Sequence, residues 1–120
     1  HLVLATIHAP NAASIIPRLI DMGIEPYMLS SSVSMILSQR LIRIFDYKLG
    51  LYGDRKGVFE IVPVNTEMRD MIHTKKTPYE IEQYLSTTGH VLLRDACKDM
   101  YVRHVTTEEE INRISLDIYS

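Results

Sequence analysis

The chain begins with an apolar run over residues 2–7, and a histidine stands at each end of it. A strand that is apolar on both faces is typical of the centre of a parallel sheet with helices packed on each side. In such sheets ligands bind at the carboxyl ends of the strands, which is where His8 lies. The pattern therefore predicts a buried strand that ends at a candidate site. Because the chain starts on this strand without a methionine, we expect it to be a piece of a longer protein.

After the first strand, apolar residues recur at the spacing of a helix. This spacing predicts a helix that begins near Ser14 and ends at Gly23, with Pro17 tolerated in its first turn. Pro26 is expected to begin a second helix at its first position, and the apolar positions of that helix extend to Ile36.

Two further strands are predicted, over residues 39–45 and 57–64, because both stretches are rich in β-branched and apolar residues. Residues 46–56 are polar and glycine-containing, so they are expected to form a loop. In the last strand Phe59 and Ile61 share one face. The opposite face carries Val58, Glu60 and Val62.

The remainder of the chain reads as helical. Asn65 can cap a short helix, and Thr77 with Glu80 has the pattern of a capping box. A second capping box is predicted at Thr107 and Glu110, at the start of the last helix. The order of elements predicts an α/β fold of about three strands followed by helices, with residues 1–64 as one unit and 65–120 as a helical subdomain.

Composition narrows the classes of protein to consider. The chain has 120 residues, of which 46% are hydrophobic, so it can bury the core of one domain or two small lobes. Its formal net charge of −2 provides no general field for nucleic acid. Cys97 is the only cysteine, so neither an intrachain disulfide nor a cysteine zinc cluster is available. We predict no metal site.

The candidate chemistry lies in a few histidines and arginines. The glycines form no phosphate-binding loop, so the chain alone should not hold a nucleoside triphosphate tightly. His1 and His8 are separated by an odd number of residues and would point to opposite faces of a strand. Arg40, Arg43 and Arg55 are candidate anion contacts. Each arginine alone is more often a solvated side chain, and His8 alone is more often a polar residue at a strand end.

Four segments in collinear order resemble one family, the secretion ATPases of type II secretion and type IV pilus assembly. The opening HLVLATIHAPNAASIIPRLIDMGIEP is similar to that family's histidine box and following helix, with His1 and His8 matching the two histidines. SQRLIR is similar to its Gln-Arg-Leu strand. RKGVFEIVPVNTEMRDMI resembles its Gly-Arg-x-Gly-(Ile/Val)-(Tyr/Phe)-Glu segment, and LLRDACKDMYVRHVTTEEEINRI resembles its C-terminal helices.

The resemblance implies the C-terminal part of a RecA-like P-loop ATPase domain whose phosphate-binding loop and Walker B acid lie upstream. The parent would use ATP and magnesium, and it would work as a cytoplasmic homo-hexamer on an inner-membrane platform protein. The resemblance also implies that His8 faces the γ-phosphate and that His1 supports it. It further implies that Arg40 and Arg55 contact nucleotide or the ring interface. The fragment alone is expected to bind no cofactor and to be inactive.

One departure from the family concerns residues 44–54. Many assembly ATPases carry a four-cysteine zinc motif at this place, whereas this chain has a short segment without cysteine. Two other functions stay open. The helices of residues 65–120 could form a non-catalytic module that docks a partner protein. Alternatively, the chain could be a small nucleic-acid binder that uses Arg40, Arg43 and Arg55, although its negative net charge argues against this function.

Overall fold

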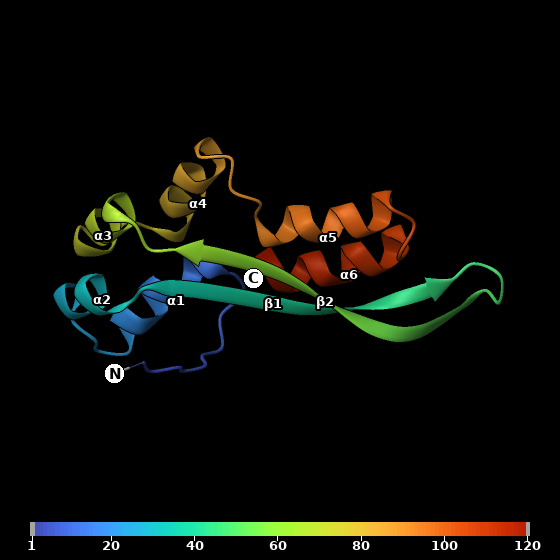
Figure 1. Ribbon diagram of the computed structural model, residues 1–120, viewed down its shortest axis with the longest axis horizontal. Coiled ribbons are helices and arrows are strands. Elements are labelled where there is room, and N and C mark those ends of the chain that lie inside the picture. The colour runs from blue at the N-terminus through green and yellow to red at the C-terminus, as the bar shows by residue number, and fades with distance from the viewer. Residues whose placement is uncertain (1, 120) are drawn as a thin grey trace.

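The computed structural model describes residues 2–119, and a long antiparallel hairpin forms its axis (Figure 1). Strand β1 (Met35–Asp46) pairs with β2 (Leu51–Pro63) in a two-stranded sheet. The pairing runs from Met35 opposite Pro63 to Asp46 opposite Leu51. The molecule measures 53 × 29 × 24 Å, with its longest dimension along the hairpin.

The two faces of the hairpin differ as the alternation of residues predicts. Phe59 and Ile61 are each 49% exposed. The side chains of the opposite face of β2 are buried: Val58, Glu60 and Val62. Residues with period-two alternation must place every second side chain on the same face, and here only one face is covered by helices.

The expected loop over residues 46–56 is much shorter than predicted. The strands continue to Asp46 and resume at Leu51. The carboxylate of Asp46 accepts hydrogen bonds from the backbone N–H groups of Lys48 and Leu49 at 2.9 and 3.0 Å. Gly50 adopts φ +69°, which glycine reaches without strain, and closes the turn. Polar residues are compatible with strand pairing here because this end of the hairpin extends beyond the helices (Figure 1).

Helices α1 (Ala12–Asp21), α2 (Pro26–Ser32), α3 (Thr66–His73) and α4 (Pro78–Thr87) gather around one end of the hairpin (Figure 1). Their apolar faces share a core cluster with the adjacent strand ends. The members of this cluster are Ala12, Ala13, Ile16, Leu29, Ile36, Val62, Val64, Met68, Ile72, Ile81, Leu85 and Leu92.

Two predicted helix boundaries are wrong. Helix α1 begins two residues before Ser14, because the Asn11 side chain caps it, so Pro17 lies inside the helix and not in its first turn. The second helix ends at Ser32, and Ile36 belongs to β1. Serine hydroxyls that bond to nearby carbonyls compete with a continued helix, and Ser31 does so with Tyr27 at 3.0 Å.

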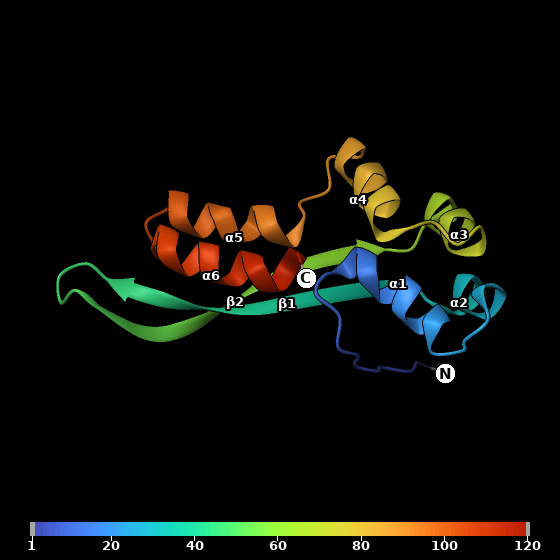
Figure 2. The ribbon, with the colours of Figure 1, turned by 180° about the vertical axis from the view of Figure 1, so that it is seen from behind.

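Helices α5 (Leu93–Val102) and α6 (Glu108–Tyr119) lie side by side over the middle of the hairpin (Figures 1 and 2). They enclose a second core cluster of Ile42, Val58, Leu93, Cys97, Met100, Ile111, Ile114 and Ile118. The connection between the two helices also covers the outer edge of β1, since the Phe45 N–H donates to the Val105 carbonyl at 3.0 Å. None of the helices described over residues 2–119 has both the length and the apolar character required to cross a membrane.

The predicted strand over residues 2–7 is wrong in this structure. The segment has no regular secondary structure, and Leu2, Val3 and Leu4 are 89%, 78% and 87% exposed. A strand that is apolar on both faces requires a neighbouring strand and cover on each face, and the described residues offer this segment neither. The sheet of the described chain therefore has two strands, whereas about three were predicted.

Candidate functional site

His8 and Arg40 line the same open cleft. The cleft has a volume of about 480 Å³ and lies between the segment before α1, strand β1 and helix α6. Its lining residues are Ile7, His8, Ala9, Pro10, Arg40 and Asp117. Two of the site residues predicted from the sequence, 32 positions apart, are thus brought together. The other predicted histidine, His1, lies outside the described residues.

Arg40 positions the segment that carries His8. Its Nη2 donates a hydrogen bond of 2.7 Å to the carbonyl of Pro10, two residues after His8, and its Nη1 donates to the Gln39 carbonyl at 2.9 Å. A guanidinium group has five N–H donors, so others remain for an anion in the cleft. Arg40 can therefore support the histidine segment and contact a ligand at the same time.

Asn11 anchors the same segment at two points. Its carboxamide oxygen accepts hydrogen bonds from the backbone N–H and the hydroxyl of Ser14 at 3.0 and 2.9 Å, which caps α1. Its amide nitrogen donates to the Ile118 carbonyl at 2.9 Å, near the end of α6. The turn after His8 is consequently fixed to β1, α1 and α6, although His8 itself is exposed.

A buried carboxylate beside α1 was not predicted to have a partner. Glu60 is only 2% exposed, and its Oε2 lies 3.0 Å from Nε2 of His90. Its Oε1 accepts a hydrogen bond of 3.3 Å from the backbone N–H of Ala12, at the start of α1. A carboxylate is stabilised at a helix N-terminus, where N–H groups are unpaired. The position of Glu60 on the buried face was visible in the alternation, but nothing in the sequence pointed to His90.

Arg55 lies elsewhere, in a second cleft that it shares with Leu41, Arg43 and Arg113. Of the predicted anion contacts, only Arg40 therefore accompanies His8. Within residues 2–119, no cluster of three or more histidine, cysteine or acidic side chains could hold a metal ion. Burial raises the pKa of the Cys97 thiol to about 11, so this cysteine is protonated at neutral pH and unreactive.

The fold matches part of two solved ATPases. The pilus retraction motor PilT with bound ADP matches 95% of this chain and 32% of its own length, with a TM-score of 0.73 and 22% identity. The ATPase DotB of Yersinia pseudotuberculosis matches 92% of this chain and 29% of its own length, with a TM-score of 0.71 and 17% identity. The prediction of an α/β fold is confirmed, although the described sheet has two strands instead of about three, and this fold matches part of the two ATPases.

The sequence comparisons agree with the fold. A family model described as Type II/IV secretion system protein matches residues 1–113. Type II secretion system protein E of Pseudomonas aeruginosa is 32% identical over 96% of this chain, and HxcR of the same organism is 30% identical over 98%. The chain belongs to the type II/IV secretion system protein family. It spans 30% and 29% of the length of these two relatives.

Proposed function

We propose that the chain is the C-terminal part of a longer motor ATPase, in which ATP hydrolysis drives type II secretion or type IV pilus assembly. Membership of the family supports this proposal, as does the likeness to PilT and DotB. In this proposal the parent works as a cytoplasmic homo-hexamer at the inner face of the cytoplasmic membrane, where it acts on a platform protein.

The observation that carries the proposal is the shared cleft of His8 and Arg40. A neutral imidazole at this place can polarise a phosphate oxygen or orient the attacking water without acting as the base. Arg40 supplies positive charge and holds the Pro10 carbonyl, which keeps the histidine segment beside β1. We assign His8 the phosphate-side role and His1 a supporting one.

The described residues fit only one side of an ATP site. His8 and Arg40 are suitable donors for a phosphate, whereas magnesium prefers oxygen ligands, and the cleft contributes a single carboxylate, that of Asp117. In the proposal, the phosphate-binding loop and the magnesium ligands therefore come from the remainder of the parent. When bound, ATP with magnesium supplies the γ-phosphoryl group that is transferred to water.

Phosphate release by the parent and by the 120-residue chain tests this division of the site. We expect hydrolysis by the parent and none by the chain above a heat-inactivated control. An inactive parent, or hydrolysis by the purified chain that survives removal of contaminating ATPases, would contradict the proposal.

A further inference from the structure

Three arginines surround a cleft on the exposed face of the hairpin, beside α6. The cleft has a volume of about 390 Å³ and is lined by Leu41 and Arg43 of β1, Arg55 of β2 and Arg113 of α6. We call the side chains of Arg43, Arg55 and Arg113 the arginine triad. It shares no lining residue with the cleft of His8 and Arg40.

The hairpin places two members of the triad directly opposite one another. Arg43 pairs with Arg55 in the register of the sheet. The Arg43 N–H donates to Glu110 at 2.7 Å, and its carbonyl accepts from the Thr106 hydroxyl at 2.6 Å, so both groups point away from β2. The two arginines consequently form a non-hydrogen-bonded pair, the kind in which facing side chains are closest. Like charges in this position destabilise a sheet unless an anion compensates them.

The described residues supply only part of that compensation. Glu110 is completely buried and binds Arg43 at 2.8 Å and Arg113 at 2.8 Å. The hydrogen bond from Arg113 to Glu110 raises the pKa of Arg113 although burial opposes it, and the charge of Asp117 adds to the increase. The side chain of Arg55, by contrast, forms no hydrogen bond or ion pair with any residue in the described part of the chain.

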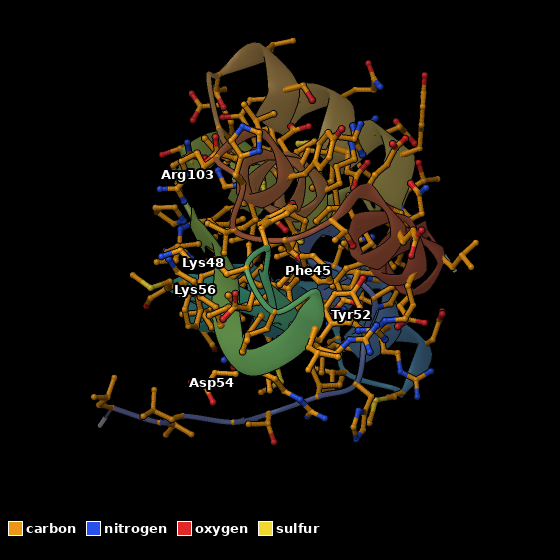
Figure 3. The ribbon with its side chains drawn as sticks, turned by 90° about the vertical axis from the view of Figure 1, so that its right-hand side faces the viewer. Phe45, Lys48, Tyr52, Asp54, Lys56 and Arg103 are labelled. Carbon is orange, nitrogen blue, oxygen red and sulfur yellow. The ribbon has the colours of Figure 1, made fainter. Side chains whose placement is uncertain are left out.

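Two of the three guanidinium groups are held in place before any ligand arrives. Arg43 lies over the ring of Tyr52, 4.1 Å from its centre, and is hydrogen-bonded to Glu110 through Nε and Nη2. Arg113 binds the same carboxylate through its own Nε and Nη2. Neither Arg43 nor Arg113 uses its Nη1 in these hydrogen bonds to Glu110. Figure 3, viewed from the hairpin tip, shows Tyr52 on the α6 side and both Lys48 and Lys56 on the other side. Neither lysine is among the residues that line the cleft.

We propose that the arginine triad binds a phosphate-type oxyanion, either inorganic phosphate or the phosphate group of a nucleotide. Arg55 is the principal contact, because residues 2–119 leave its side-chain donors unused, and Arg43 and Arg113 contribute their remaining N–H groups. Three planar donors around one cleft suit an anion with several equivalent oxygens, and arginine binds phosphate in a bidentate manner. The family resemblance alone offered nucleotide or the ring interface for Arg55. The new content is a three-arginine anion site with Arg43 and Arg113, and it does not depend on the proposed motor function.

Equilibrium dialysis of the 120-residue chain against labelled inorganic phosphate, ADP and adenosine tests the proposal. Arg55→Gln should weaken binding of the phosphate-containing ligand about 10-fold or more, since it removes charge-assisted hydrogen bonds. Arg18→Gln is the matched control, because Arg18 is an exposed arginine on α1, and it should bind as the unaltered chain does. Neither substitution removes a contact of the buried core.

The ligands distinguish the two sources of the anion. Binding of inorganic phosphate and ADP with similar affinity supports a site for free phosphate, and binding of ADP alone supports a nucleotide site. Adenosine should not bind. Equal binding by the chain and Arg55→Gln, or equal competition by chloride at the same ionic strength, would identify an adventitious ion only. Self-association that depends on Arg55, without any binding of phosphate, would assign the triad to an acidic surface of a second copy and overturn the proposal.

Discussion

Glu110 joins β1 to α6 through Arg43. The Glu110 carboxylate accepts a hydrogen bond from the Arg43 backbone N–H at 2.7 Å through Oε2 and pairs with Arg43 Nη2 at 2.8 Å through Oε1. The residues are 67 positions apart, and the carboxylate is fully buried while the Arg43 side chain is 40% exposed. The Glu110 side chain thus accepts a hydrogen bond from the backbone edge of β1 and also pairs with the guanidinium group of Arg43 on the same strand.

Replacing Glu110 with glutamine tests how much this connection stabilises the fold. The amide keeps the volume of the carboxylate but removes the charge that faces Arg43 and Arg113. We expect the free energy of unfolding to fall by about 1–2 kcal/mol, because charge-assisted hydrogen bonds are lost while the two arginines, 40% and 51% exposed, stay partly solvated. Urea denaturation measures the change. The neighbouring exposed residue supplies the control, since Glu109→Gln should change the free energy by less than about 0.5 kcal/mol. Equal effects of the two substitutions would refute the role of Glu110.

The same carboxylate predicts how stability depends on pH. Hydrogen bonds from Arg113, and then from Arg43, hold the pKa of Glu110 far below its ordinary value of 4.5, although burial opposes them. Because the folded pKa is lowered, the ionised group stabilises the fold above about pH 4.5, and this contribution is lost as pH falls below that value. The chain and Glu110→Gln should therefore differ most in free energy of unfolding at pH 7 and progressively less towards pH 3. A difference that does not change over this range would contradict the prediction.

A third prediction concerns the buried pair of Glu60 and His90. Removing the imidazole by His90→Ala leaves Glu60 Oε2 without its partner at 3.0 Å, in a place where the carboxylate is 2% exposed. The free energy of unfolding should fall by about 2 kcal/mol, the cost of an unsatisfied buried acceptor. His90→Gln retains a donor and should lose less. Urea denaturation of these variants beside His73→Ala, at an exposed histidine of α3, provides the measurement. Equal stability of His90→Ala and His73→Ala would show that the pair is unimportant.

Local patterns in the sequence predicted local structure well. The capping box of Thr77 and Glu80 is confirmed, with both of its hydrogen bonds present. Only one of the two hydrogen bonds of the capping box predicted at Thr107 and Glu110 is present. The Glu110 N–H donates to the Thr107 hydroxyl at 3.2 Å, but the Glu110 side chain is bound to the two arginines instead. A contact between β1 and α6 overrides the local preference, and no spacing along the chain reveals it.

Long-range pairing explains the other differences. The polar residues around Gly53 indicated a loop, yet they continue β2 because the hairpin brings Tyr52 opposite Phe45. The apolar run of residues 2–7 indicated a buried strand, but its burial depends on neighbours that the described chain does not supply. His8, at a predicted strand end, and Arg40, a candidate anion contact, were both named as candidate site residues from the sequence, and the family resemblance gave them their roles. Their shared cleft arises from the hydrogen bond between Arg40 and Pro10, which only the structure shows. The boundary between residues 1–64 and 65–120 stays a prediction.

The phosphate-side role of His8 is tested most directly by steady-state ATP hydrolysis of the full-length parent carrying His8→Ala. His73→Ala serves as the control, because His73 is exposed on α3 and lies outside both clefts. We predict that His8→Ala lowers the turnover number by about 100-fold, with a much smaller change in nucleotide affinity, and that the control retains its turnover. An unchanged turnover number in His8→Ala would contradict the central claim that this histidine acts on the phosphate side of the site.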